Sequence, residues 1–376
     1  MTWAAEERLD DAALVEAADP AGMLRQVASA AAQVRAAAGL AGETDLSEIA
    51  AGGRPRAVVV TGMGGSGIAG DMLTAVCGSG CPVQVMSVHD YRLPGWVGAA
   101  DLVIAVSCSG STEETLAAAR EAVRRGCRLL VVGGKGSPLA AIAEQARAPF
   151  VPVQSVGTPR STLWSLSVPL VVAARRLGIV EMPTDAYESA AAELERVSHL
   201  CRPDSEAFVN PAKGLALELA GTLPMIWGTS PLAAVAAYRF ACQLSENAKY
   251  PAVSGALPEA NHNQVVAFDG PFAPGPGAAL AQDGDGPPLP LRLVLLRDTR
   301  EHPQVARRRE ESARLAAQRG IGVTELAAAG DRPLERLASL VQLIDYATVY
   351  LAIAQAIDPA PVAAIAELKA RIADTR

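Results

Sequence analysis

The sequence predicts an α/β protein made of two doubly wound, flavodoxin-like units, each a parallel sheet flanked by helices. Three observations support this class. After residue 55, short apolar runs alternate with helix-like segments, as in successive strand–helix–strand units. Two of these runs end in loops of glycine and small polar residues, at 62–67 and 107–112. The chain from 210 onward repeats the pattern of the first half.

Composition and charge exclude several classes of function. The chain has 376 residues, of which 50% are apolar but only 4% aromatic, so a core of Ala, Val and Leu is expected. A net charge of −7 without a basic stripe predicts neither nucleic acid nor membrane as a partner. The first residues lack the apolar core of a signal peptide, so we expect a cytoplasmic protein. The six cysteines lack metal-site spacing and are expected to be reduced thiols.

The first half of the chain is predicted in order from its apolar runs. Residues 1–55 form an Ala-rich helical extension, and residues 56–200 form the first domain. Predicted strands lie at 57–61, 83–88, 102–107, 128–132 and 149–153, and predicted helices at 67–77, 112–125, 137–147, 161–177 and 184–200. The helix at 112–125 is the best signalled, because Thr112 can serve as its N-cap and Gly126 follows its end.

The second domain, predicted at 201–376, echoes these elements. Predicted strands lie at 223–227, 291–296 and 321–326. One predicted helix begins at Pro231, and three more span 303–319, 334–356 and 361–373. Its loop at 297–301 contains Asp298 and Glu301, which would repel an anion, so one phosphate site per chain is expected, in the first domain. Between 270 and 290, 11 of 21 residues are Gly or Pro, which predicts a surface insertion.

The two loops at 62–67 and 107–112 carry the chemistry of binding. Each offers backbone N–H groups and hydroxyls where a helix begins, which suits a phosphate held without Lys or Arg. The first loop also fits G-x-G-x-x-G, with Asp90 after the next strand, so a dinucleotide is the alternative ligand. A phosphate monoester accounts better for a ring of donors from both loops. The predicted phosphate-binding residues are Gly65, Ser66, Ser107, Ser109 and Thr112.

These motifs carry a family resemblance. Gly-Met-Gly-Gly-Ser-Gly at 62–67 and Ser-x-Ser-Gly-x-Thr-x-Glu-Thr from 107 resemble a sugar isomerase (SIS) domain. Thr-Pro-Arg-Ser at 158–161, Ser-Glu-Asn-Ala-Lys at 245–249 and Glu-Ala-Asn-His-Asn at 259–263 resemble the bifunctional phosphoglucose/phosphomannose isomerase family. The resemblance implies two SIS domains and a homodimer that isomerises sugar phosphates with no metal or cofactor. One departure is Ser111, where the family usually has Asn.

The resemblance also implies catalytic roles. Glu246 lies near a helix C-terminus, where the macrodipole disfavours a negative charge and so favours a group that accepts a proton. On position alone a surface residue paired with Lys249 is the favoured interpretation, and it is the resemblance that makes Glu246 the base. The resemblance makes His262 the ring-opening acid/base, contributed by the neighbouring subunit. It likewise places Arg160 beside the enediolate and Lys369 near the ring oxygen.

The predicted activity interconverts glucose 6-phosphate or mannose 6-phosphate with fructose 6-phosphate through a cis-enediol(ate). The alternative is a regulatory SIS protein that binds a sugar phosphate without turnover. The presence of Arg160, Glu246 and His262 favours the enzyme. The preferred aldose depends on how one hydroxyl at C2 is accommodated, which the sequence does not determine.

Overall fold

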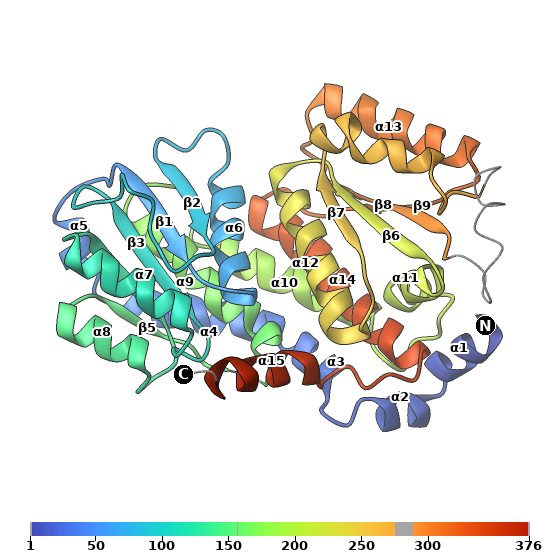
Figure 1. The fold of residues 1–376 in the computed structure, drawn as a ribbon, viewed down its shortest axis with the longest axis horizontal. Helices are drawn as coiled ribbons and strands as arrows, with labels where there is room; N and C mark the ends of the chain where they lie inside the picture. Colours follow the sequence, from blue (N-terminus) through green and yellow to red (C-terminus); the bar gives the residue numbers. More distant parts are fainter. Residues whose placement is uncertain (1, 156, 275–288, 375–376) are drawn as a thin grey trace. The chain divides into compact units, whose positions relative to one another are not determined.

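A computed structural model describes residues 2–155, 157–274 and 289–374. It confirms the α/β class, with two parallel sheets flanked by helices (Figure 1). The chain divides into two compact units. The five-stranded unit comprises Ala28–Arg196 and Ala329–Ser339, and the four-stranded unit comprises Met1–Val27, Val197–Ala328 and Leu340–Arg376. Of the predicted insertion at 270–290, residues 275–288 lie outside the described residues.

The five-stranded sheet has the order β2-β1-β3-β4-β5, and every pairing in it is parallel. Its strands are β1 (Ala57–Thr61), β2 (Gln84–Val88), β3 (Leu102–Ser107), β4 (Arg128–Gly133) and β5 (Phe150–Pro152). All residues of β1 and β3 are buried, which explains why both appear in the sequence as unbroken apolar runs. The chain leaves β1 toward β2 and leaves β3 toward β4, in opposite directions across the sheet. The loops after β1 and β3 therefore meet at a topological switch point.

Helices cover both faces of this sheet. The helices from residue 30 to residue 200 are α4 (Ala30–Glu43), α5 (Ser47–Ala50), α6 (Gly65–Cys77), α7 (Glu113–Arg124), α8 (Pro138–Ala146), the 3-10 helix η1 (Pro159–Thr162), α9 (Leu163–Arg176) and α10 (Ala186–Leu200). Leu116 of α7 and Leu139 of α8 join Val59, Val103 and Val131 of the strands in one hydrophobic core. Helices α6 and α9 pack on each other, and α4 packs along α9.

The four-stranded sheet repeats the same topology, with the order β7-β6-β8-β9 and parallel pairing throughout. Its strands are β6 (Leu223–Gly228), β7 (Val253–Ala256), β8 (Leu291–Arg297) and β9 (Gly322–Ala327). In this order β6 takes the place of β1, and β8 the place of β3. Trp227 of β6 stacks on Phe268 with ring centroids 5.6 Å apart, at the centre of the core on one face. Two parallel sheets of matching order fit the two predicted SIS domains.

The remaining helices are α1 (Thr2–Asp10), α2 (Ala12–Ala18), α3 (Met23–Ala28), α11 (Pro211–Leu219), α12 (Pro231–Ala248), η2 (Glu259–His262), η3 (Gln264–Asp269), α13 (Pro303–Gln318), α14 (Pro333–Ala354) and α15 (Ala363–Asp374). Helix α14 is long and apolar enough to cross a membrane by length and composition. However, 94% of its most apolar 18-residue window is buried within the protein, as in a core helix.

The N-terminal extension predicted at 1–55 is divided between the two units. Met1–Val27 belongs to the four-stranded unit, whereas α4 and α5 belong to the five-stranded unit. The domain boundaries drawn from the sequence at 55 and 200 stay a prediction.

Candidate functional site

The first loop, Gly62 to Gly67, joins β1 to α6 and depends on glycine for its shape. A Cβ on Gly62 would lie 2.8 Å from the Ser66 carbonyl oxygen and 3.0 Å from that of Val106 at the end of β3. Gly64, with φ +56°, precedes the helix in a conformation that side chains rarely adopt. The glycines thus bring the backbone of this loop directly against the neighbouring strand end.

Ser66 links the first loop to the second. Its side chain is buried, and its hydroxyl accepts a hydrogen bond of 3.3 Å from the backbone N–H of Cys108. Since Ser66 lies in the first turn of α6 and Cys108 directly follows β3, one hydroxyl joins the two strand ends. The structure therefore brings the two loops together, as expected for strands that are neighbours in the sheet.

The second loop, from Ser107 to Thr112, contains a chain of hydroxyls. The buried Ser107 hydroxyl accepts the N–H of Gly110 at 3.0 Å and shares a 3.0 Å hydrogen bond with the Thr112 hydroxyl. The exposed Ser109 hydroxyl accepts from the N–H and the hydroxyl of Ser111, at 3.3 and 3.0 Å. Ser111, the residue that departs from the family pattern, thus donates to Ser109, one of the predicted phosphate-binding residues.

Thr112 is the N-cap residue of α7, as the sequence predicts. It occupies the N-cap position of α7 with extended backbone, but its side chain makes no capping hydrogen bond. The hydroxyl turns to Ser107 instead. The prediction of Thr112 as the N-cap residue of this helix is therefore confirmed, although its hydroxyl belongs to the polar group at the switch point and not to the cap.

Arg160 lies beside the first loop, on the turn η1. A Cβ built on Gly65 would lie 3.7 Å from the Pro159 carbonyl oxygen and 3.9 Å from the Arg160 Cα. The Arg160 residue is buried, with 5% of its surface exposed. The five-stranded unit thus gathers Gly65, the predicted phosphate hydroxyls and the backbone of Arg160 at one end of its sheet.

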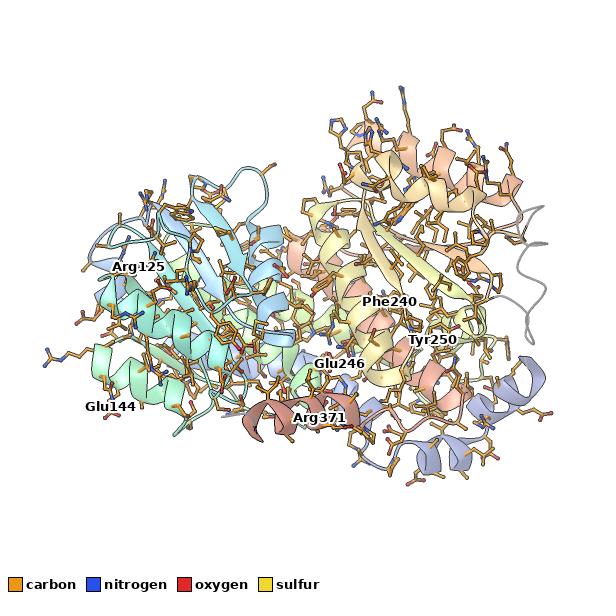
Figure 2. The ribbon with its side chains drawn as sticks, in the orientation of Figure 1. Arg125, Glu144, Phe240, Glu246, Tyr250 and Arg371 are labelled. Atoms are coloured by element: carbon orange, nitrogen blue, oxygen red, sulfur yellow. The ribbon has the colours of Figure 1, made fainter. Side chains whose placement is uncertain are left out.

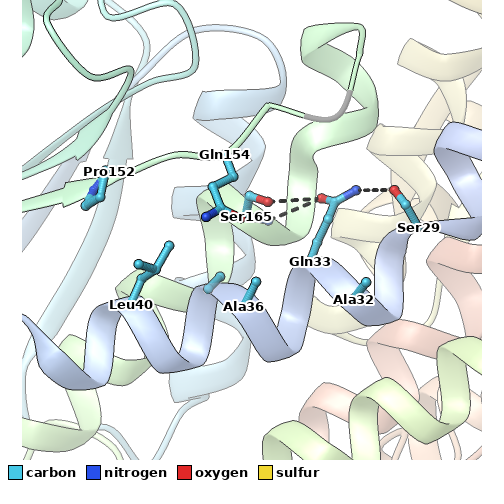
Figure 3. A pocket seen from close by; sticks show the side chains of 9 residues that line it. Ser29, Ala32, Gln33, Ala36, Leu40, Pro152, Gln154 and Ser165 are labelled. Atoms are coloured by element: carbon cyan, nitrogen blue, oxygen red, sulfur yellow. Dashed lines mark hydrogen bonds between the residues drawn. The ribbon is translucent and has the colours of Figure 1, made fainter.

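Gln33 of α4 holds the turn that carries Arg160, and sequence reasoning missed it. Its amide donates to the Ser161 carbonyl at 2.8 Å and to the Ser29 hydroxyl at 3.0 Å, and its carbonyl accepts the Ser165 N–H at 3.3 Å. Figure 3 shows Gln33 between Ser29 and Ser165, beside a cavity of about 150 Å³. The sequence shows only a glutamine within an Ala-rich helix, which gives no indication of its contact with the turn of Arg160.

In the four-stranded unit, Glu246 lies in the last turn of α12 and is half-buried (Figure 2). The helix is followed by its C-cap residue Lys249, whose backbone is left-handed with φ 57°. The Lys249 ammonium donates to the carbonyls of Glu246 and Asn247, at 2.8 and 3.2 Å, and to that of Pro359 at 3.3 Å. Its positive charge therefore offsets the helix dipole next to Glu246.

Buried contacts fix the rotation of α12. Arg239 forms a bidentate ion pair with Asp345 of α14, and the Asn247 amide donates to the Thr348 hydroxyl at 2.9 Å. Because Asn247 directly follows Glu246, its contact with α14 holds in place the backbone that carries the carboxylate.

His262 ends the short helix η2 and is exposed. Its neighbours are anchored, since Asn261 donates to the Ser312 hydroxyl of α13 at 2.7 Å and Asn263 donates to the Glu259 carboxylate at 2.9 Å. The histidine is thus presented on a fixed turn. Lys369 lies on the exposed helix α15 of the same unit.

The loops after β6 and β8 correspond to the two phosphate loops, but here the Asp298 carboxylate accepts the hydrogen bonds that a bound anion would accept. The Asp298 side chain accepts the Ser230 hydroxyl at 2.7 Å and the Arg300 N–H at 3.0 Å. The Thr229 hydroxyl in turn accepts the Asp298 N–H at 2.9 Å. This geometry agrees with the expectation that the second copy is unsuited to an anion.

Comparison with known proteins decides the family. A protein of Caldicellulosiruptor bescii named bifunctional phosphoglucose/phosphomannose isomerase is 34% identical over 85% of this chain and 90% of its own. The chain belongs to the bifunctional phosphoglucose/phosphomannose isomerase family. In keeping with this membership, residues 208–372 match the bacterial phospho-glucose isomerase C-terminal SIS domain. The resemblance stated from the sequence is therefore confirmed.

Two further similarities bear on the fold and the chemistry of relatives. A hypothetical protein of Thermus thermophilus superposes with a TM-score of 0.70 at 18% identity, covering 98% of this chain and 93% of its own, which supports the fold. A Sulfolobus acidocaldarius protein named D-glucosamine-6-phosphate 4-epimerase is 29% identical over 55% of this chain and 62% of its own. Proteins related to this isomerase family thus include one with another named activity.

Proposed function

We propose that the protein interconverts glucose 6-phosphate, mannose 6-phosphate or both with fructose 6-phosphate. The observation that carries the proposal is the 34% identity, over 85% of the chain, to a protein named for these two isomerase activities. The alternative of a regulatory protein without turnover is disfavoured by this similarity. The hydroxyl-rich switch point of the five-stranded unit supports a phosphate-bearing substrate.

In this proposal the two loops hold the phosphate monoester. Ser66, Ser107, Ser109 and Thr112 supply hydroxyl donors, and Gly65 supplies a backbone N–H in the first turn of α6. A monoester presents three terminal oxygens, so donors from two loops match it better than one glycine loop alone. Asp90, the ribose-binding residue of the dinucleotide alternative, accepts a hydrogen bond from the next backbone N–H, that of Tyr91.

The proposed chemistry is a proton transfer between C2 and C1. Glu246 removes the proton from one carbon and returns it to the other, because a carboxylate can serve as base and then as acid. Arg160 stabilises the enediolate with a charge that stays positive at every relevant pH. His262 opens the sugar ring, and Lys369 assists near the ring oxygen.

The quaternary and cellular context is also proposed. The enzyme acts as a cytoplasmic homodimer in which each active site receives His262 from the neighbouring subunit. The exposed position of His262 on a fixed turn suits contact with a second chain. A sample with equal numbers of inactive Glu246→Gln and His262→Ala subunits should then recover part of the activity, and no recovery in confirmed mixed dimers would refute the sharing.

The decisive experiment is a coupled assay with fructose 6-phosphate that follows both aldose products, with glucosamine 6-phosphate as a separate substrate. Glu246→Gln should lower kcat about 100-fold or more, because the amide cannot accept the proton. Glu144→Gln, an exposed carboxylate of α8, is the matched control and should keep full activity. Turnover of glucosamine 6-phosphate alone, or binding without any turnover, would overturn the proposal.

A further inference from the structure

A histidine that the catalytic assignment does not use lies against the first phosphate loop. His89 follows β2 directly, and its ring Nδ1 lies 3.0 Å from the carbonyl oxygen of Gly62, the first glycine of the loop. Its other ring nitrogen, Nε2, lies 3.7 Å from the carboxylate of Asp71 on α6. The ring therefore bridges a carboxylate and the backbone of the loop.

Gly67, the last glycine of the loop, makes room for this ring. A Cβ on Gly67 would lie 2.6 Å from the His89 Nδ1 and 2.9 Å from the Gly62 carbonyl oxygen. Both distances are far below normal contact, so a side chain at 67 would displace the ring or the loop. Gly67, His89 and the Gly62 carbonyl thus form one packed unit within the five-stranded unit.

Only the doubly protonated His89 ring has an N–H directed at both the Gly62 carbonyl and the Asp71 carboxylate. Donation from Nδ1 to Gly62 by a neutral imidazole would leave the Nε2 lone pair facing the Asp71 carboxylate. The interaction with Asp71 raises the pKa of His89, burial opposes this, and the Gly62 carbonyl adds to the rise. Asp71 of α6 is the charged group that acts on the ring, and Asp90, the next residue in the chain, is also acidic. The imidazolium is therefore retained to a higher pH than in a free histidine.

We propose that His89 is a positioning residue for substrate phosphate: bridged to Asp71, its imidazolium holds the Gly62 carbonyl and so fixes the first phosphate loop in its binding shape. The inference rests on the proposed role of this loop. Neither phosphate loop contains Lys or Arg, so the imidazolium is also a positive charge on the backbone of the loop. His89 acts through Gly62, and it need not touch the substrate.

The test measures KM and kcat for fructose 6-phosphate, and the dissociation constant of inorganic phosphate by calorimetry. His89→Leu should raise KM and weaken phosphate binding about tenfold while kcat changes by less than about twofold. His89→Asn, whose amide can still donate near the Nδ1 position, should restore most of the affinity. Asp71→Asn keeps the ring but removes its anionic partner and should weaken phosphate binding by a smaller factor. His199→Leu, which removes an exposed histidine of α10, is the matched control and should change neither quantity.

The pH profile separates this role from a purely structural one. The affinity advantage of the wild type over His89→Leu should be full at low pH, where the ring is charged. It should decrease as the pH rises through the pKa of His89, which lies above that of a free histidine, because the neutral ring can still donate to the Gly62 carbonyl but no longer carries a positive charge. Unchanged phosphate binding in a folded His89→Leu, or equal losses in the Leu and Asn variants, would overturn the inference. Calorimetry needs no turnover, so a protein that lacks isomerase activity but binds phosphate through His89 would refute the proposed function alone.

Discussion

The buried ion pair between α12 and α14 gives a prediction whose size follows from the structure. The Arg239 guanidinium donates to both carboxylate oxygens of Asp345, at 2.9 and 2.6 Å. Only 1% of Arg239 and 6% of Asp345 is exposed. The helix that carries Arg239 also carries Glu246 two turns later, so the pair anchors the proposed catalytic base.

Removing one partner should cost much more than removing both. Arg239→Met leaves the Asp345 carboxylate buried without its countercharge, which costs about 3–5 kcal/mol in comparable sites. The double variant Arg239→Met/Asp345→Leu leaves no buried charge at this position, so it should unfold at a urea concentration near that of the wild type. The difference between single and double variants isolates the cost of the unpaired carboxylate.

The penalty should also depend on pH. Burial raises the pKa of Asp345, and the Arg239 charge opposes that rise. Without Arg239 the folded-state pKa rises further above the unfolded value. Folding then takes up a proton, so the single variant loses stability as the pH rises through the interval between these two pKa values and regains it as the pH falls.

Urea unfolding followed by circular dichroism at pH 5 and pH 8 measures both effects. Arg239→Met should lose about 3–5 kcal/mol at pH 8 and less at pH 5, because the carboxyl can be protonated there. A loss below about 1 kcal/mol at pH 8, or one that is equal at both pH values, would refute the argument that an unpaired charge is responsible.

Two further predictions concern the switch point. Gly67→Ala should raise KM for fructose 6-phosphate at least tenfold, because its Cβ would lie 2.6 Å from the His89 Nδ1, whereas Gly80→Ala, with no neighbouring atom within 4 Å, should be neutral in the same assay. Gln33→Leu should lower the free energy of unfolding by about 1–3 kcal/mol, because the Ser161 carbonyl loses its buried donor. If this turn positions Arg160 for catalysis, kcat should also fall in steady-state measurements. An unchanged kcat would mean that Gln33 contributes only to the stability of the fold.

The sequence predicted most strands of the fold because buried parallel strands leave a strong local signal. The strands predicted at 57–61 and 102–107 coincide with β1 and β3, which are apolar up to their last residue, a threonine in β1 and a serine in β3. Strand β7, with the sequence Val-Ser-Gly-Ala, escaped prediction because it is a short edge strand without an apolar run. Its place beside β6 depends on pairing with distant residues rather than on its own composition.

The N-terminal helices show a second limit. The Ala-rich pattern correctly indicated helix, but the structure has the five separate helices α1 to α5 between Thr2 and Ala50. Alanine favours helix at every position and gives no periodic signal of where a helix ends. The breaks are set by local features such as Gly22, with φ 64°, and the Asp19 carboxylate, which accepts the backbone N–H of Met23 at 2.7 Å.

Some residues of the candidate site could be predicted from their local sequence, and others could not. Both phosphate loops were predictable, because glycine and hydroxyl residues at strand ends carry their chemistry within a few positions. Gln33 and His89 were not, because their partners lie 128 and 27 residues away along the chain. Neither residue type suggests a role until the fold brings its partner within hydrogen-bonding distance.

The two units share one strand order, but the switch point of one contains a carboxylate and that of the other contains neutral hydroxyls. After β6 and β8, hydroxyl and N–H donors meet at a switch point, as they do after β1 and β3, but the Asp298 carboxylate accepts from Ser230 and from the N–H of Arg300. A phosphate entering there would have to displace or approach a fixed negative charge. In the other unit the corresponding residues, Ser66 and Ser107, are neutral and bond only to nearby N–H and hydroxyl groups in the contacts described above. The position in the fold supplies the donors in both units, and the charge of one side chain determines whether they can serve an external anion.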